Sequence, residues 1–394
     1  MRLLALFALF AASLLPAQDR VVINDSVDAE LQKGIIPISV VSDDQVLGNL
    51  VQFALSTHGA ISLRAGSSVK VAISRSGLTA TVACDNARFA FQSTVEGKDE
   101  DELALRTADA ALVGLGKRWQ LKPLFAGTKI AFTSKFSGHQ EIYVTNLARS
   151  KTLRLTNYRN TSIGPRWSAD GTRVYFVSSV RTGFPEIFST NGIGEPRKVI
   201  TDVRGALGAA SSGPDGRIAF GSSNKGTMDI FVAGPNGEAP HRVIATPDVD
   251  ADPSWSPDGA RFALTSGPVG HPGIYLASSA GGGVTRVSTG YGYCTEPRWN
   301  PSVPNQLIFT FQSGRLSLGI INLSAGTVTP VPVTSPLDLS HASWCADGRH
   351  LIATQATKTN SWLAVVDSVT GKVTRLSSVQ MADCSQPDCW VRRN

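Results

Sequence analysis

Cysteine and histidine are the residue types in this sequence best suited to carry chemistry, yet their spacing completes no catalytic or metal-binding motif. Six histidines lie at positions 58, 139, 241, 271, 341 and 350, scattered over different predicted strands and loops. The cysteines match no common zinc pattern, because two spaced cysteine–histidine pairs are absent. We therefore expect neither a metal site nor any other cofactor. The five cysteines are Cys84, Cys294, Cys345, Cys384 and Cys389.

The two last cysteines flank a turn-like tetrapeptide, Ser-Gln-Pro-Asp. Such a turn could bring the sulfurs of Cys384 and Cys389 together, which leaves a Cys384–Cys389 disulfide and two free thiols as the alternatives. An odd number of cysteines leaves at least one thiol unpaired in either case.

Motifs of the common enzyme classes are absent from the sequence. It contains no Gly-x-Ser-x-Gly nucleophile elbow, no His-Glu-x-x-His helix and no Walker loop. The net charge is +6, but lysine and arginine form no cluster of the kind that nucleic-acid binding requires. We predict that the protein is not an enzyme and does not bind nucleic acid.

The N-terminus has the pattern of a secretory signal peptide, assigned to residues 1–17. Arg2 supplies the positive charge, an apolar run extends from Leu3 to Leu15, and Pro16-Ala17 forms a cleavage site. No later apolar run is long enough to span a bilayer. We expect an exported, monomeric protein without direct membrane insertion.

A repeat of about 44 residues determines the fold prediction. The segment Asp252-Pro-Ser-Trp-Ser-Pro-Asp-Gly259 recurs in degraded copies, and its tryptophans lie at 167, 255, 299, 344 and 390. The first gap is twice the others, and the missing position falls on Ser212. A period near 44 is typical of one β-propeller blade. The tryptophans are interpreted as packing between blades, and the aspartates before glycine as turn formers.

Counting strands predicts a six-bladed propeller over residues 128–394. Each copy has a tryptophan segment followed by three further strand signals, and the series begins at the second strand, Lys129 to Thr133. The C-terminal strand around Trp390 then completes the first blade, which removes an open edge. In the alternative, Trp119 supplies that inner strand and the C-terminal strand is surplus.

The residues before the propeller lack this period. Residues 18–33 are predicted to form an extended N-terminal arm, and residues 34–120 a small α+β domain. In that domain a capping box at Ser42-Asp-Asp-Gln45 opens a helix to about His58, and Asp99-Glu-Asp-Glu opens a second helix to Leu115. The expected fold class is thus an all-β six-bladed propeller preceded by an α+β domain.

In these features the chain resembles the TolB family of the periplasmic Tol-Pal system. The repeat has the family's Pro-x-Trp-Ser-Pro-Asp-Gly … Ile-Ala-Phe … Ile-Tyr-Val … Leu-Thr form. Arg20-Val-Val-Ile-Asn-Asp-Ser-Val-Asp28 and Gly34-Ile-Ile-Pro-Ile38 resemble the family's N-terminal arm and first strand. The α+β domain is shorter than is usual in the family.

The resemblance implies a periplasmic binding scaffold that maintains envelope integrity and supports constriction during cell division. A TolA-like inner-membrane protein would bind the arm, and a Pal-like peptidoglycan-associated lipoprotein would bind one propeller face. The implied arm residues are Arg20, Val21, Val22, Ile23, Val27 and Asp28; the implied face residues, in the loops leading into the tryptophan strands, are Thr295, Glu296, Ala206, Gly208, Asn160 and Asp250.

Two other functions remain open at this point. A lactonase-like hydrolase would need carboxylates and histidines converging on the central channel around a metal ion. A glycan-binding propeller would need exposed aromatic side chains, whereas most tryptophans here are assigned to packing.

Overall fold

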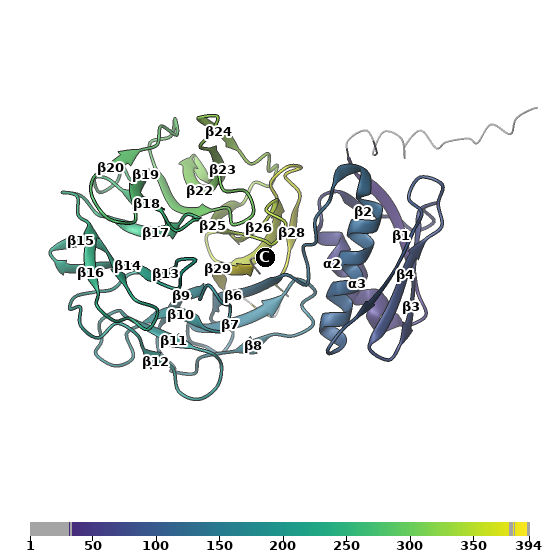
Figure 1. Cartoon of the computed structure of the whole chain (residues 1–394), viewed down its shortest axis with the longest axis horizontal. Coiled ribbons are helices and arrows are strands. Elements are labelled where there is room, and N and C mark those ends of the chain that lie inside the picture. Colours follow the sequence, from purple (N-terminus) through teal and green to yellow (C-terminus); the bar gives the residue numbers. More distant parts are fainter. Residues whose placement is uncertain (1–30, 32–33, 378–380, 382, 392–394) are drawn as a thin grey trace, which may run out of the picture.

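A computed structural model describes residues 31, 34–377, 381 and 383–391. Figure 1 shows an α+β region beside a ring of six four-stranded sheets. The fold class predicted from the sequence, a six-bladed β-propeller preceded by a small α+β domain, is confirmed. Within the described part of the chain, no helix is long and apolar enough to cross a bilayer.

The α+β region is one five-stranded sheet with two helices. The strands lie in the order β2-β1-β3-β4-β5, in which only β1 pairs in parallel, with β2 and β3. In Figure 1 both helices lie between this sheet and the propeller. The elements are β1 (Ile36–Ser42), α2 (Gln45–Thr57), β2 (Ile61–Leu63), β3 (Lys70–Ser76), β4 (Thr79–Cys84), β5 (Phe91–Glu96), α3 (Glu100–Leu115) and the short 3-10 helix η1 (Lys117–Trp119).

Both helices begin at an aspartate cap. The Asp44 carboxylate accepts the Leu47 N–H at 2.9 Å, and the Asp99 carboxylate accepts the Glu102 N–H at 2.8 Å. The predicted helix is present, but the capping box at Ser42-Asp-Asp-Gln45 is wrong, because Ser42 is still part of β1 and the cap lies two residues later, at Asp44. Trp119, the alternative source of an inner strand, lies in η1.

Each blade is an antiparallel sheet whose first strand faces the central channel. Blade 1 consists of β29 (Cys384–Val391), β6 (Thr128–Ser134), β7 (Glu141–Asn146) and β8 (Leu153–Arg154); blade 2 of β9 (Ser162–Trp167), β10 (Val174–Ser178), β11 (Glu186–Thr190) and β12 (Arg197–Lys198); blade 3 of β13 (Ser211–Ser212), β14 (Ile218–Lys225), β15 (Thr227–Ala233) and β16 (His241–Ile244). Blade 4 consists of β17 (Ala251–Trp255), β18 (Arg261–Ser266), β19 (Gly273–Ser278) and β20 (Val284–Arg286); blade 5 of β21 (Cys294–Trp299), β22 (Gln306–Ser313), β23 (Arg315–Asn322) and β24 (Thr327–Pro330); blade 6 of β25 (Asp338–Trp344), β26 (His350–Ala356), β27 (Ser361–Asp367) and β28 (Val373–Arg375).

The ring closes where the tryptophan spacing predicts. Strand β29 pairs antiparallel with β6, with Cys384 opposite Ser134 and Val391 opposite Thr128. Strand β29 therefore completes the blade that β6 begins, and it covers the edge of β6 that would otherwise be open.

The alternating strand directions give the ring two different ends. The connections between blades, and the hairpins between second and third strands, lie at the end where the inner strands begin, which we call the loop end. The Asp-Gly turns, such as that at Gly171, and the hairpins between third and fourth strands lie at the opposite end, which we call the turn end.

The tryptophans pack between blades, as the sequence interpretation has it, and the last copy differs only in its position on the strand. The Trp255 indole N–H donates to the Ser211 carbonyl of blade 3, and that of Trp344 to the Arg298 carbonyl of blade 5. In blade 1, however, Cys389 pairs with Ile130, the position that the tryptophans hold elsewhere. Trp390 lies one residue later and reaches blade 2, where its indole donates to the Ala169 carbonyl at 3.1 Å.

The α+β region and the propeller share one apolar core, which includes Leu112 of α3, Phe125 of the connecting segment, Phe132 of β6 and Leu363 of β27. The Asp109 carboxylate is buried at this junction. It accepts the N–H groups of three successive residues, Leu124, Phe125 and Ala126, at 2.6, 2.8 and 2.9 Å. The connecting segment is therefore held to α3 by hydrogen bonds as well as by apolar packing.

We expect Gly171→Ala to lower the free energy of unfolding by about 1–3 kcal/mol more than Gly138→Ala. Both glycines have positive φ, at 66° and 89°, so both variants carry similar backbone strain. A Cβ at Gly171 would lie 2.3 Å from the Trp390 ring, whereas nothing lies within 4 Å of one at Gly138. Urea unfolding of both variants measures the difference; equal destabilisation would show that the Trp390 contact does not constrain the ring.

Candidate functional site

Two of the residues assigned to the partner face, Thr295 and Glu296, lie on β21 near the loop end of the channel. Thr295 pairs with Thr310 of β22, and a β-bulge follows it in the register. Glu296 occupies this bulge with φ of 59°, and 17% of its side chain is exposed. The structure therefore places both residues beside the channel rather than on a protruding loop.

The Glu296 carboxylate joins two blades. One oxygen accepts the backbone N–H of His341 and the Thr310 hydroxyl, both at 2.8 Å, and the other lies 2.8 Å from His341 Nε2. His341 holds the same bulge position in blade 6, with φ of 51°. Glu296 is therefore first of all a link between blades 5 and 6.

The same bulge recurs around the channel. Positive φ angles occur at Gly164, Asp252, Glu296, His341 and Gln386, one in each of five blades. The Gln386 side-chain carbonyl accepts the Gly164 N–H at 3.0 Å, which repeats across blades 1 and 2 the link made by Glu296. A bulge twists the strand and turns its residue toward the neighbouring blade, so this ring of bulges is a structural feature of the loop end.

The pKa values of two carboxylates in this ring of bulges, Glu296 and Asp252, shift in opposite directions. Burial raises the pKa of Glu296, but hydrogen bonds and the charge of His341 outweigh burial, so that the net pKa lies below its ordinary value. Burial, aided by the nearby charge of Glu296, raises the pKa of Asp252. At this level of the channel, therefore, His341 lies near two carboxylates whose pKa values shift in opposite directions.

The other residues assigned to the partner face differ in accessibility. Asn160 is exposed in the connection between blades 1 and 2. Ala206 and Gly208 are partly exposed, and their backbone N–H groups bond to Ser223 and Gly221 of β14. Asp250 is fully buried.

The assignment of Asp250 to a partner surface is wrong. Its carboxylate accepts the Thr246 N–H at 2.8 Å and the Ser266 hydroxyl at 2.6 Å, so its bonding capacity is used to hold the connection between blades 3 and 4. The arm residues Arg20, Val21, Val22, Ile23, Val27 and Asp28 lie outside the described residues.

The structure contains no Cys384–Cys389 disulfide, so that alternative is overturned. Both residues belong to the extended strand β29, and both thiols are free. The four strand residues between them hold the two cysteines roughly 15 Å apart, far beyond disulfide reach. Ser-Gln-Pro-Asp forms a bulge within the strand and not a turn, because Ser385 and Asp388 both pair with β6 and the register shifts between them. The neighbour of Cys389 is the thiol of Cys345, whose pKa burial raises and hydrogen bonding to Cys389 raises further.

Exposed apolar side chains at the loop end are a feature that the sequence analysis did not identify. Val269 is 91% exposed, Phe184 67%, Phe136 58% and Val249 40%. Three of them lie at the hairpin tips between second and third strands of blades 1, 2 and 4, and Val249 lies in the connection between blades 3 and 4. The useful signal would have been a large apolar residue in a glycine-containing hairpin, where a polar residue is the norm.

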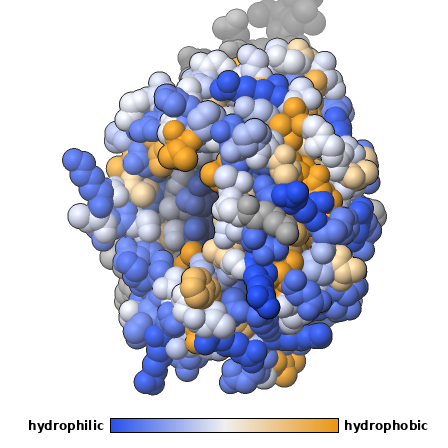
Figure 2. Space-filling view, turned by 90° about the vertical axis from the view of Figure 1, so that its left-hand side faces the viewer, coloured by the Kyte–Doolittle hydropathy of each residue, from blue (hydrophilic) through white to orange (hydrophobic). Residues whose placement is uncertain are grey.

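The outer edge of the ring differs from the loop end. Figure 2 views the side that carries β15, β16 and β20 in Figure 1, where hydrophilic residues predominate and apolar residues gather only in small groups. A mixed surface of this kind is ordinary for a folded protein.

Among the residues that the structure describes, one cluster of donor atoms could hold a metal ion. Side-chain donors of His58, Asp347 and His350 lie within 4.8 Å of one another, buried between the α+β region and blade 6. In the structure this cluster is bonded internally: His350 Nδ1 lies 2.5 Å from Asp347, and its Nε2 lies 3.2 Å from Asp367. The His58 ring packs on His350 with centroids 4.3 Å apart.

We call this contact of His58 with His350, Asp347 and Asp367 the joint between the α+β region and blade 6. The pKa values of its two histidines shift in opposite directions. Burial lowers the pKa of His350, but the charges and hydrogen bonds of Asp347 and Asp367 reverse this effect and raise it to about 9. Burial, together with the neighbouring charge on His350, places the pKa of His58 well below its ordinary value. The joint thus consists of one charged and one neutral imidazole, completed by Lys372, whose ammonium donates to the His58 and Ile61 carbonyls.

The propeller is similar in sequence to a known protein family. The family model described as the TolB beta propeller domain matches residues 193–391. A TolB homolog of Chlorobium luteolum is 32% identical over 162 residues, and a Tol-Pal system protein TolB of Anaeromyxobacter dehalogenans is 28% identical over 162 residues. In both alignments the match covers 41% of this chain and 36% of the relative, so it spans about a third of the relative's length.

The fold comparison covers more of the chain. The crystal structure of TolB from Acinetobacter baumannii superposes with a TM-score of 0.76, covering 90% of this chain and 96% of that one at 16% identity. At that identity the likeness concerns the fold alone, including an α+β region before the propeller.

We expect Glu296→Ala to lower the free energy of unfolding by about 1–3 kcal/mol, because the His341 N–H loses its buried acceptor. Thr295→Ala is the control: the residue is adjacent and partly exposed, and we expect a change below about 0.5 kcal/mol. Urea unfolding at neutral pH measures both. Equal stability of the two variants would contradict the linking role of Glu296.

We also expect stability to fall as pH rises from about 6.5 to 9. The folded pKa of His350 exceeds its unfolded value, so its contribution is complete below pH 6.5 and is lost as pH passes through about 9. A loss of roughly 2–3 kcal/mol follows from a shift of this size. Free energies of unfolding across this pH range test it against His350→Gln, whose slope should be flatter; parallel slopes would contradict the assignment.

Proposed function

The chain belongs to the TolB β-propeller family, and we propose that it acts as a periplasmic protein-binding scaffold of the Tol-Pal envelope system. In this proposal the loop end of the propeller binds a Pal-like outer-membrane lipoprotein, and the N-terminal arm binds a TolA-like inner-membrane protein. The scaffold thereby helps to maintain envelope integrity and supports constriction during division.

The observation that carries the proposal is the set of exposed apolar side chains at the loop end. Phe136, Phe184 and Val269 come from different blades, Val249 from the connection between blades 3 and 4, and all four lie at the same end of a closed ring. The turn end also exposes large aliphatic side chains, Ile193 and Val369, so the loop end is distinguished by its two exposed phenylalanine rings, and aromatic side chains are enriched where a partner binds. Because the blades are rigid, these tips are preorganised, which reduces the entropy lost on binding.

Residues at the channel mouth support a binding role over catalysis. The carboxylate of Glu296 and the imidazole of His341 bond to each other and to the frame of the ring. Thr295, which is adjacent to Glu296, is partly exposed, and Asn160 is exposed in the connection between blades 1 and 2, so both could contact a partner directly. A hydrolase would instead need an acid–base pair whose hydrogen-bonding capacity is free for substrate.

The joint between the α+β region and blade 6 would connect the two binding functions. The packing of the His58 ring on His350 and the Lys372 hydrogen bonds to the carbonyls of His58 and Ile61 hold the two regions in one arrangement. A partner bound at the loop end and another bound through the arm would then pull on a single body rather than on a flexible linkage.

The test is a binding titration with a Pal-like lipoprotein from the same organism, purified without its lipid. We expect Phe184→Ser to weaken binding at least about tenfold, because an exposed aromatic anchor is lost. Isothermal titration calorimetry gives the dissociation constants, with circular dichroism to verify folding.

Ile193→Ser is the matched control, because Ile193 is 81% exposed in the same blade but lies in the hairpin between β11 and β12 at the turn end. Its binding should equal that of the unmodified protein. Loss of binding in Ile193→Ser alone would place the partner at the wrong end of the ring, and no binding by the unmodified protein would reject this partner.

A further inference from the structure

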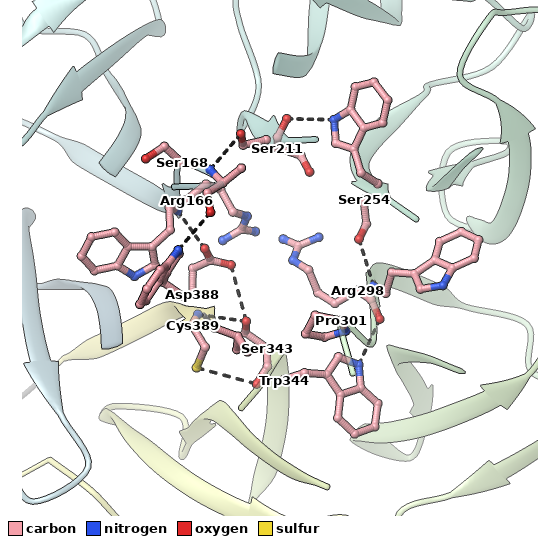
Figure 3. Close-up of a pocket in the computed structure, with 17 residues that line it drawn as sticks. Arg166, Ser168, Ser211, Ser254, Arg298, Pro301, Ser343, Trp344, Asp388 and Cys389 are labelled. Atoms are coloured by element: carbon pink, nitrogen blue, oxygen red, sulfur yellow. Dashed lines mark hydrogen bonds between the residues drawn. The ribbon is translucent and has the colours of Figure 1, made fainter. Parts of the chain in front are cut away.

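A second ring of side chains lies inside the channel, one position before the tryptophan position of each blade. The strand registers identify its members as Arg166, Ser211, Ser254, Arg298, Ser343 and Asp388. Figure 3 shows these six side chains around the channel axis. In ring order, starting from blade 1, the side-chain groups are one carboxylate, one guanidinium, two hydroxyls, one guanidinium and one hydroxyl.

Three members of this ring belong to the frame of the propeller. The Ser254 hydroxyl accepts the Trp299 N–H and the Ser343 hydroxyl accepts the Cys389 N–H, both at 3.0 Å. The Asp388 carboxylate likewise accepts the Trp167 N–H at 2.9 Å. Each of these bonds connects one blade to the next, which explains why a short acceptor side chain stands at these positions.

The two arginines cannot take part in this pattern, because a guanidinium has no acceptor. Arg166 and Arg298 belong to blades 2 and 5, which lie opposite each other in a ring of six. Each donates one N–H to the carbonyl of its own preceding proline, Pro165 or Pro297, at 2.9 Å. This shared bond directs both guanidinium groups into the channel, where Figure 3 shows them pointing toward each other.

Neither guanidinium forms an ion pair with any residue that the structure describes. Arg166 is nevertheless only 8% exposed, and Arg298 is partly buried. Two positive charges facing each other at low exposure repel one another and lose hydration, a cost that an anion between them would offset.

The nearby carboxylates do not supply that anion. Asp388 is bonded to blade 2, and burial raises its pKa despite the opposing influence of Arg166. Asp252 lies at the bulge level of blade 4, and burial raises its pKa as well. Both acids thus favour the neutral form more than an exposed carboxylate does.

The space between the arginines limits the size of the anion. The cavity has a volume of about 120 Å³ and is lined further by Ser168, Ser212 and the tryptophans. That volume equals roughly four waters at their share of the liquid, enough for a small ion but not for a nucleotide. A planar carboxylate presents its two oxygens to one guanidinium fork, whereas a tetrahedral oxyanion can offer oxygens to forks on both sides.

We propose that Arg166 and Arg298 bind a small tetrahedral oxyanion of the phosphate class on the axis of the propeller channel. The site lies deeper in the channel than the bulge ring at the loop end. It does not depend on the proposed partner binding.

The experiment is calorimetric titration of the full chain with inorganic phosphate in chloride buffer at constant ionic strength. We expect saturable binding at a single site, weakened at least about tenfold by either Arg166→Gln or Arg298→Gln, because each variant removes a charge-assisted pair. Asp388→Asn should tighten binding, because it removes the only acidic group of the ring.

Arg261→Gln is the control for loss of a positive charge, because Arg261 is exposed and lies 5.1 Å from the Trp299 ring outside the cavity lining. It should bind phosphate as the unmodified protein does. The proposal fails if the unmodified protein does not bind phosphate, if Arg261→Gln weakens binding as much as the channel variants, or if acetate binds equally well. Because no partner protein is present, none of these results bears on lipoprotein binding.

Discussion

Closure of the ring is the constraint on which the rest of the structure depends. A four-stranded blade has two edges and two exposed faces, and only packing against neighbours on both sides buries its apolar residues. The pairing of β29 with β6 gives every blade two neighbours. The bulge ring at the loop end and the hydrogen bonds among inner strands can form only because the circle is complete.

Much of this architecture could be predicted from the sequence because it is periodic. The 44-residue spacing identified six inner strands, including the one in which Ser212 replaces tryptophan, and it indicated which strand completes blade 1. Periodicity also misled at the last copy, where Trp390 is displaced by one residue and Cys389 takes the tryptophan position. The hydrogen-bond register determines which residue takes the tryptophan position, and the residue types alone do not reveal a shift by one residue.

The site was less predictable because it depends on contacts between distant residues. The burial of Asp250 follows from its bonds to Thr246 and Ser266, and nothing in its own segment distinguishes it from an exposed loop aspartate. Cys384 and Cys389 flank residues that favour a turn, but pairing with β6 keeps them extended. The facing arginines become visible only when the blades are arranged in a circle, because Arg166 and Arg298 are 132 residues apart in the chain.

The channel therefore combines two kinds of residue on the same short strands. Acceptors such as Glu296, Gln386, Ser254 and Asp388 hold one blade to the next, while the arginines point away from that frame. The loop tips beyond the channel mouth carry the exposed apolar groups. Substitutions in these three sets should have separable effects on the protein.

The pairing of β29 with β6 also has a consequence for the order in which the molecule folds. Cys384 and Ser134 are 250 residues apart, so the innermost strand of blade 1 becomes available only after the other five blades have been synthesised. Until then β6 has an unpaired edge open to other chains. Bringing such distant segments together is entropically slow, so docking of β29 is expected to be the late step of folding and the stage most sensitive to aggregation.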